Sequence, residues 1–196
     1  MHQLLDKYLC DKYPKIFADR YKPMTETCMC WGLDVGNGWY SLLDNLCHNI
    51  QQHIDNPQWI YNEKIKEYEE PPEGTTACPQ VVAQQVKQKF SGLRFYYSGG
   101  DEYIHGLVDN AESLSYFICE ECGVMDESVG RNKVGWIVTS CREHARNKEN
   151  FNTNGGKDLE KIWRKVRQDE EEKRKKIKED WRQSDMFGLL FGEPPK

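Results

Sequence analysis

The stretch Ile118-Cys119-Glu120-Glu121-Cys122-Gly123 is followed further along the chain by Cys141-Arg142-Glu143-His144. Each stretch carries two metal-binding residues with two residues between them, so both side chains of a pair can reach one ion from a tight turn. The glycine after the second cysteine permits the left-handed backbone that such a turn needs. The spacing therefore predicts a zinc site with four ligands: Cys119, Cys122, Cys141 and His144.

The residues between the two pairs bear on what the metal does. Four protein ligands are typical of a structural zinc, whereas a catalytic zinc usually keeps one position open. Residues 124–140 have a turn-rich middle followed by Trp136-Ile137-Val138-Thr139, which predicts a hairpin, and a short helix is predicted after His144. The hairpin holds no histidine to act as a nuclease base, and Cys141 lacks the second cysteine of the zinc deaminases. We therefore expect a treble-clef-like, structural zinc.

Apolar residues at steps of three and four predict two helices, over 39–54 and 101–117. Two strands are expected within 80–98, although the first of them also has a spacing that permits a helix. Residues 1–22 look helical, and the proline-rich residues 55–79 predict a surface excursion with a short helix over 59–68. The expected fold class is α+β, with a small antiparallel sheet, helices, the zinc-binding hairpin and a charged C-terminal helix.

The chain changes character after residue 150. A linker is predicted over 151–156, and a helix over 157–183 in which acidic residues precede basic ones by four, as Glu171 precedes Lys175. Leu159, Ile162, Trp163 and Val166 can pack on a neighbour, whereas the next half of this helix should be solvated. The predicted organisation is a zinc-containing domain over 1–150, the linker, the charged helix, and a terminal interaction peptide over 184–196.

The terminal peptide is the second sharp signal in the sequence. Its apolar residues cannot form a core alone, so they either fold back on the domain or insert into a groove of a partner protein. The predicted partner-binding residues are Met186, Phe187, Leu189, Leu190 and Phe191.

Composition limits the remaining classes. The 196 residues carry a net charge of -5, which does not favour a surface that grips a phosphate backbone. No apolar run approaches the roughly 20 residues of a membrane span, and the N-terminal residues do not have the pattern of a secretory signal. We therefore expect a cytoplasmic protein that does not associate with a membrane. Without a signal, the eight cysteines favour metal binding over disulfides.

Other groups of residues leave alternatives open. A second metal site could form from Cys28, Cys30, Cys47 and His48, although Cys47 falls on an apolar helix face. Asp101, His105 and Asp109 share one helix face and could serve a nucleic-acid or nucleotide-processing enzyme, or could be a solvated surface. A nucleic-acid-binding module would use the basic residues around the hairpin: Arg131, Lys133, Arg142 and Arg146.

Several stretches resemble a family of uncharacterised bacteriophage and prophage proteins with a CxxCG…CxxH zinc site. They are TETCMCWGLDVGNGWYSLLDNLC, VKQKFSGLRFYY, DEYIHGLVDNAESLS, ICEECG and WIVTSCREH, together spanning about residues 4–146. The resemblance implies a phage gene product and the zinc site, and the family offers no activity to carry over to this chain. A phage gene product without a secretory signal is expected in the host cytoplasm. The tail DMFGLLFGE is similar to the C-terminal peptides with which T-even-type phage proteins dock on the sliding clamp.

The sequence thus predicts a non-enzymatic phage accessory protein with a structural zinc. It would act by binding a protein partner, in DNA replication, transcription or host takeover. A nucleic-acid-binding module or an enzyme is the alternative.

Overall fold

The computed structural model describes residues 1–57, 60–132 and 135–183. The chain divides into two units, Met1–Asn154 and Gly155–Lys196. Among the helices in the described ranges, none combines the length and apolar composition that a bilayer crossing requires. Together the described helices and sheets make an α+β fold.

The main sheet of the first unit has three strands in the order β1-β4-β5. The hairpin of β4 (Val82–Lys89) and β5 (Gly92–Ser98) is antiparallel, as the sequence predicts, and β1 (Leu33–Asp34) runs parallel to β4. The sheet is therefore mixed, and the expectation of a purely antiparallel sheet is wrong. The short 3-10 helix η1 (Cys28–Trp31) directly precedes β1, and β4 follows β1 much later in the chain. The two strands are therefore not joined by a hairpin turn.

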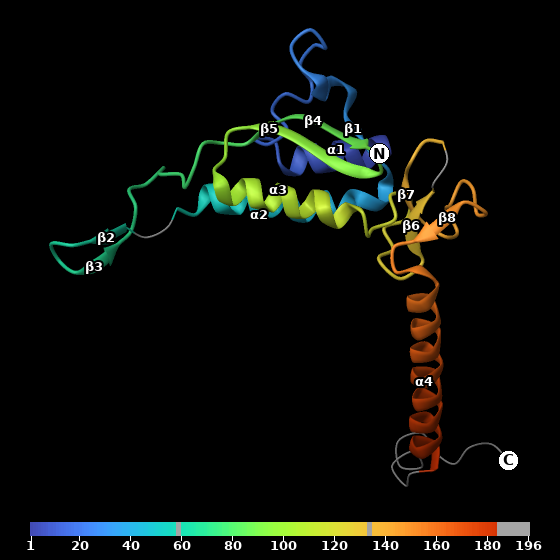
Figure 1. Ribbon diagram of the computed structural model, residues 1–196. Helices are drawn as coiled ribbons and strands as arrows, with labels where there is room; N and C mark the ends of the chain where they lie inside the picture. The colour runs from blue at the N-terminus through green and yellow to red at the C-terminus, as the bar shows by residue number, and fades with distance from the viewer. Residues whose placement is uncertain (58–59, 133–134, 184–196) are drawn as a thin grey trace. The chain divides into compact units, whose positions relative to one another are not determined.

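Two helices lie side by side on one face of the β4–β5 hairpin (Figure 1). The first, α2 (Tyr40–Asp55), follows the 3-10 helix η2 (Asn37–Trp39). The second, α3 (Glu102–Ser115), begins where the carboxylate of Asp101 accepts a hydrogen bond of 3.0 Å from the N–H of Ile104. Both helices agree with the sequence prediction, because each has a continuous apolar face. The buried residues of α2 are Leu43, Leu46, Cys47, Ile50 and Ile54.

The N-terminal helix, α1 (Gln3–Lys12), is shorter than the predicted helical stretch of 1–22. Residues 14–22 form turns instead, consistent with a proline at position 14 that cannot continue a helix. These turns bring Arg20 back to Asp6 of α1, with 2.6 Å between Nη2 and Oδ2. The tertiary ion pair thus fixes the path of a segment that local propensity assigns to a helix.

The predicted short helix over 59–68 is wrong. Strands β2 (Ile60–Asn62) and β3 (Glu67–Glu69) pair in an antiparallel hairpin there, and residues 58–59 lie outside the described ranges. The side-chain oxygen of Asn62 accepts a hydrogen bond from the N–H of Lys64, and Lys66 has a φ of 57°, so the chain reverses in a tight turn.

A second three-stranded sheet, β7-β6-β8, follows α3. β6 (Val129–Asn132) pairs antiparallel with both β7 (Thr139–Cys141) and β8 (Phe151–Thr153). The predicted hairpin is confirmed. Its second strand, predicted over 136–139, instead begins at Thr139 and ends at Cys141.

The residues after His144 also differ from the prediction. Residues 145–150 form turns and bends in place of the predicted short helix, and the side chain of Asn147 accepts hydrogen bonds there from the N–H groups of Glu149 and Asn150. Part of the predicted linker over 151–156 is the strand β8, whose pairing with β6 makes it part of the first unit.

The described part of the second unit contains α4 (Gly156–Gln183), where the sequence predicts a helix over 157–183. Lys175 pairs with Glu171 at 3.0 Å, in the i,i+4 arrangement with the acid first.

Candidate metal centre

Four candidate ligands come together from two turns of the first unit. Cys119 and Cys122 lie in the turn after α3, which we call the knuckle (residues 119–123), while Cys141 ends β7 and His144 lies in the turn that follows. One ligand atom from each of the four residues lies within 4.8 Å of the others. The group can therefore hold a metal ion, as the sequence spacing predicts.

The distances within this cluster are short. The sulfur of Cys122 lies 3.9 Å from that of Cys141, and Nδ1 of His144 lies 3.7 Å from the sulfur of Cys119 and 3.1 Å from that of Cys141. Since Nδ1 faces the sulfurs, the other ring nitrogen, Nε2, is left for a second partner or solvent.

The backbone of the site favours thiolate at one of its cysteines. Burial pushes the pKa of the Cys119 thiol upward, but the N–H groups of Cys122, Cys141 and Glu121 outweigh it, and the pKa falls to about 7. Burial and the neighbouring Cys119 raise the pKa of Cys122 to about 11. Cys119 and Cys141 are buried while Cys122 and His144 are exposed, so the cluster has one side closed by protein and one side open to solvent.

Residues 36–39 donate hydrogen bonds to the knuckle and to the residue before it. The N–H of Gly38 donates a hydrogen bond of 2.7 Å to the carbonyl oxygen of Glu120, and the N–H of Gly36 donates one of 3.0 Å to its side-chain Oε1. The indole N–H of Trp39, which is fully buried, donates one of 3.0 Å to the carbonyl oxygen of Ile118. The segment before α2 thus positions the turn that carries two ligands.

Close approach explains the glycines of this segment. A Cβ on Gly38 would lie 2.1 Å from the carbonyl oxygen of Cys119 and 2.4 Å from the nitrogen of Gly123, and a Cβ on Gly36 would lie 2.1 Å from the carbonyl oxygen of Glu120. The sequence shows these glycines only as a turn. The spacing of the cysteines does not predict that these glycines contact the knuckle.

The knuckle is also joined to both sheets. The N–H of Glu120 donates a hydrogen bond of 3.0 Å to the carbonyl oxygen of Thr139 in β7, and the hydroxyl of Thr139 donates one of 2.7 Å to the carbonyl oxygen of Ser91 at the β4–β5 turn. The ligand cluster therefore lies where the two three-stranded sheets of the first unit meet.

The other groups that the sequence singles out do not assemble. No ligand cluster in the described residues includes Cys28, Cys30, Cys47 or His48. Cys47 lies on the apolar face of α2 and is buried in the hydrophobic core. His105 and Asp109 form an exposed pair at 3.6 Å, whereas Asp101 lies against His53 instead. The face of α3 thus does not gather the three residues into one site.

A second group of potential ligands was not predicted. Ligand atoms of His53, Cys78 and Asp101 also lie within 4.8 Å of one another. Only Asp101 was a candidate from sequence, because the other two residues are isolated and have no paired spacing that could have pointed to them.

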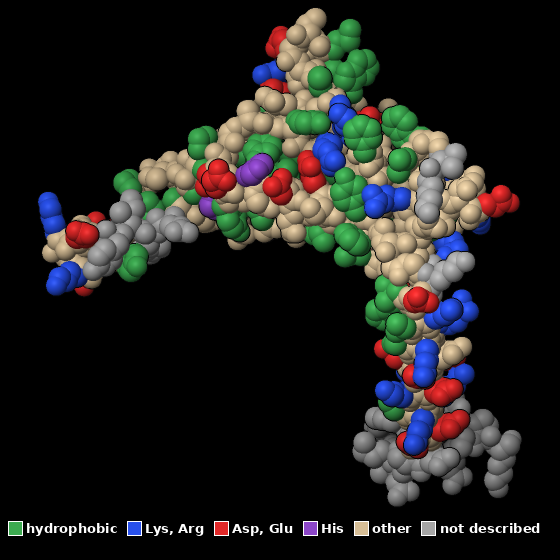
Figure 2. Space-filling view, in the orientation of Figure 1, with side chains coloured by type: hydrophobic (Ala, Val, Ile, Leu, Met, Phe, Trp, Pro, Cys, Tyr) green, Lys and Arg blue, Asp and Glu red, His purple; other side chains and the backbone are tan. Residues whose placement is uncertain are grey.

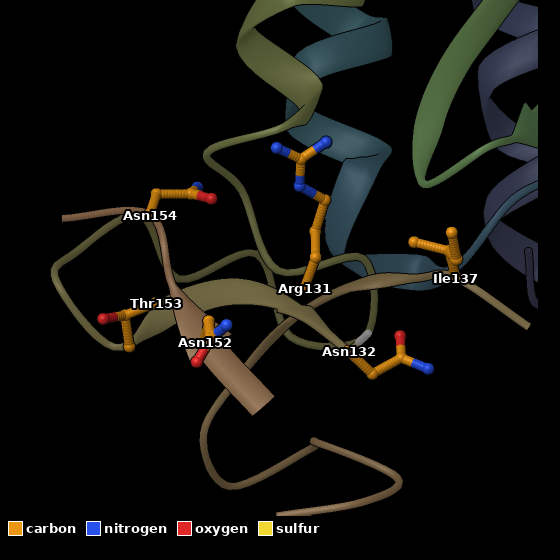
Figure 3. Close-up of a pocket in the computed structure, with 6 residues that line it drawn as sticks. All are labelled: Arg131, Asn132, Ile137, Asn152, Thr153 and Asn154. Atoms are coloured by element: carbon orange, nitrogen blue, oxygen red, sulfur yellow. The ribbon is translucent and has the colours of Figure 1, made fainter. Parts of the chain in front are cut away.

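A polar cavity of about 590 Å³ lies on the β7-β6-β8 sheet, whose strand β7 ends at the candidate ligand Cys141 (Figure 3). The guanidinium of Arg131 lies over the ring of Tyr116 at 5.4 Å, and the side chain of Asn154 donates a hydrogen bond of 2.7 Å to the carbonyl oxygen of Tyr116. The lining residues come from β6, β8, the turn after β8 and the loop between β6 and β7: Arg131, Asn132, Ile137, Asn152, Thr153 and Asn154.

The predicted partner-binding residues Met186, Phe187, Leu189, Leu190 and Phe191 lie outside the described residues. Comparison of the chain with models of protein families, with curated proteins and with solved structures finds no match.

Proposed function

We propose that the ion at Cys119, Cys122, Cys141 and His144 is zinc and that its role is structural. In a tetrahedral zinc site, sulfurs lie about 3.8 Å apart and a sulfur and a nitrogen about 3.5 Å apart. The separations of 3.9 Å and 3.7 Å in the cluster support this ion, while the 3.1 Å between Cys141 and His144 needs a small side-chain shift. With four protein ligands, no position remains for a substrate.

The proposed zinc site is similar to part of a treble-clef arrangement. A knuckle and a hairpin supply the ligands, but the residues after His144 form turns and β8 in place of the helix that completes that arrangement. We therefore propose a treble-clef-like site whose last element is a strand.

The proposed function is to bind a protein partner through α4 and the terminal peptide. The observation that carries this proposal is an apolar stripe on an otherwise charged helix: Leu159 is 37% exposed, Ile162 59% and Trp163 44%. These residues recur at the helical spacing of three and four. Figure 2 shows hydrophobic side chains near the start of α4 and mixed charges farther along it. A helix-in-groove partner uses such anchors.

The resemblance of the tail to clamp-docking peptides supports a phage sliding clamp as the first partner to test. In this proposal, the protein is a phage accessory factor whose zinc-containing unit supports a helix and a peptide that dock elsewhere. Zinc would then affect partner binding only through folding.

The test is a binding measurement with purified sliding clamp. Isothermal calorimetry would compare the full chain, a chain ending at residue 183, the variant Trp163→Asp, and the control Lys173→Ala, which changes the charged part of α4. We expect the deletion and Trp163→Asp to lose binding and the control to retain it. Equal affinity for all four proteins, or no binding by the full chain, would reject the clamp as partner.

The polar cavity supports a second candidate function, the binding of single-stranded nucleic acid. Arg131 brings a cation and Asn152 an amide to this cavity, whereas the amides of Asn132 and Asn154 already bond to backbone groups. Fluorescence anisotropy with a labelled oligonucleotide at two salt concentrations would test it. Binding that weakens with salt and is lost in Arg131→Ala would support this function, and no binding at low salt would exclude it.

A further inference from the structure

We propose that His53, Cys78 and Asp101 form a second metal site with three protein ligands and a fourth position open to solvent. It is separate from the candidate metal centre at Cys119, Cys122, Cys141 and His144. The geometry is the basis of the proposal, since a thiol, an imidazole and a carboxylate converge within 4.8 Å. These are the three side-chain types that zinc accepts. A thiolate ligand favours zinc over magnesium or calcium, which prefer oxygen.

The three ligands come from three elements that hydrogen bonds hold together. The N–H of Ala77 donates a bond of 3.0 Å to the carbonyl oxygen of Ile54, which brings Cys78 to the end of α2, where His53 lies. The N–H of Gly100 donates a bond of 2.8 Å to the carbonyl oxygen of Pro79, which brings the start of α3 to the same place. The backbone is thus fixed on both sides of Cys78.

Two of the ligands are already oriented. Nε2 of His53 lies 2.8 Å from Oδ2 of Asp101, while Oδ1 of Asp101 accepts the capping bond from the N–H of Ile104. The ring of His53 packs on that of Tyr103, with centroids 4.4 Å apart. A metal ion would replace the proton shared by His53 and Asp101, and the capping bond would hold the carboxylate in its orientation.

The third ligand supplies the charge that this pair lacks. Cys78 is 7% exposed, so its thiol is shielded from solvent but within reach of the other two groups. On binding, the thiol releases its proton to solvent and the metal takes the thiolate. The two anionic ligands and the neutral imidazole then neutralise a divalent ion.

The fourth position has access to solvent. A cavity of about 290 Å³ opens beside the site and is lined by His53, Tyr103 and three polar residues of α2 and its end: Asn49, Gln52 and Asn56. Three protein ligands plus a water is the arrangement of exchangeable and catalytic zinc sites, in contrast to the closed set at the knuckle.

The test uses the full chain with one equivalent of Zn²⁺ already bound, followed by titration with Co²⁺. Cobalt bound through a cysteine gives a thiolate-to-metal absorption band, and Cys78 is the only cysteine of the proposed site. We expect this band at one Co²⁺ per chain in the wild type, no band in Cys78→Ser, and at least a tenfold weaker affinity in His53→Gln.

Two controls make the result specific. Cys28→Ser removes an exposed thiol outside the cluster, and His105→Gln removes an exposed imidazole on α3, the helix that Asp101 caps. Both should retain the band and the affinity. The side chain of His53 is 20% exposed, and glutamine at this position keeps a polar side chain of similar size. His53→Gln therefore tests the site even if Cys78→Ser does not fold. Absence of the band in the wild type, or unchanged affinity in His53→Gln, would overturn the proposal.

Discussion

The N–H of Gly38 donates a hydrogen bond of 2.7 Å to the carbonyl oxygen of Glu120 in the knuckle. This bond joins the segment before α2 to the turn that carries two ligands of the candidate metal centre. The Cα of Gly38 lies so close to the knuckle that no side chain fits between them. The geometry of the ligand turn therefore depends on a residue that binds no metal.

Replacing Gly38 with alanine should weaken both the fold and the metal site. The new Cβ would lie 2.1 Å from the carbonyl oxygen of Cys119, so the knuckle must move. We expect a loss of about 3 kcal/mol in the free energy of unfolding, together with weaker zinc binding, measured by urea unfolding and chelator competition.

Gly106→Ala is the matched control. Gly106 lies inside α3, where an added Cβ meets nothing within 4 Å. Alanine in a helix interior is favoured over glycine by about 0.5–1 kcal/mol, so this variant should be slightly more stable. If Gly38→Ala is as stable as Gly106→Ala, the close contact with the knuckle does not exist.

Cys122→Ser should remove metal from the first site and destabilise the sheet of β6, β7 and β8. Structural zinc contributes directly to folding, so we expect a cost of about 3–5 kcal/mol and a fall in Tm of about 10 °C or more. Metal content by mass spectrometry and thermal unfolding would show both effects. Cys28→Ser, which changes an exposed thiol outside both clusters, should leave them unaltered. An unchanged Tm in Cys122→Ser would contradict a structural role of the metal.

Asp6→Asn should be strongly destabilising. The side chains of Arg20 and Asp6 are 19% and 9% exposed, and two bonds join them, of 2.6 Å and 3.3 Å. Asparagine leaves the guanidinium buried without its counter-charge, at a cost of about 3–5 kcal/mol. Asp11→Asn breaks the exposed pair with Lys7 and should cost less than about 1 kcal/mol. Urea unfolding would measure both, and similar small losses would contradict the role given to the buried pair.

Stability should fall at alkaline pH. Burial and the nearby Asp6 carboxylate raise the pKa of the Cys10 thiol from 9.0 to about 12, and burial and Asp44 raise that of the Tyr13 hydroxyl from 10.0 to about 12. A group with a raised pKa in the folded state contributes stability that is complete below its unfolded pKa. That stability is lost as the pH rises through the folded value.

Between pH 9 and 12, the free energy of unfolding should therefore decrease as pH rises. Each such group steepens the decrease by up to about 1.4 kcal/mol per pH unit. Cys10→Ala removes one of them, so its slope should be shallower than that of the wild type. Urea unfolding at a series of pH values gives both slopes, and equal slopes would show that Cys10 does not carry this linkage.

Local patterns explain what could be predicted. The ligands Cys119, Cys122, Cys141 and His144 were found because short spacing within each pair is itself a geometric constraint. The helices α2 and α3 are predictable because the apolar residues of each recur with a period near 3.6, which places them on one buried face. The sequence does not predict the hairpin of β2 and β3, because its charged residues and prolines show no strand-turn-strand pattern. The turn depends on the side-chain hydrogen bond of Asn62 and on the positive φ of Lys66.

The sequence by itself determined the first ligand set, the main helices, the β4–β5 hairpin and the charge pairs of α4, since each depends on residues close together in the chain. Only the tertiary structure decided that residues 36–39 hold the knuckle and that His53, Cys78 and Asp101 meet. These contacts join segments far apart in sequence. They arise from how helices and sheets pack together, and no local spacing encodes that packing.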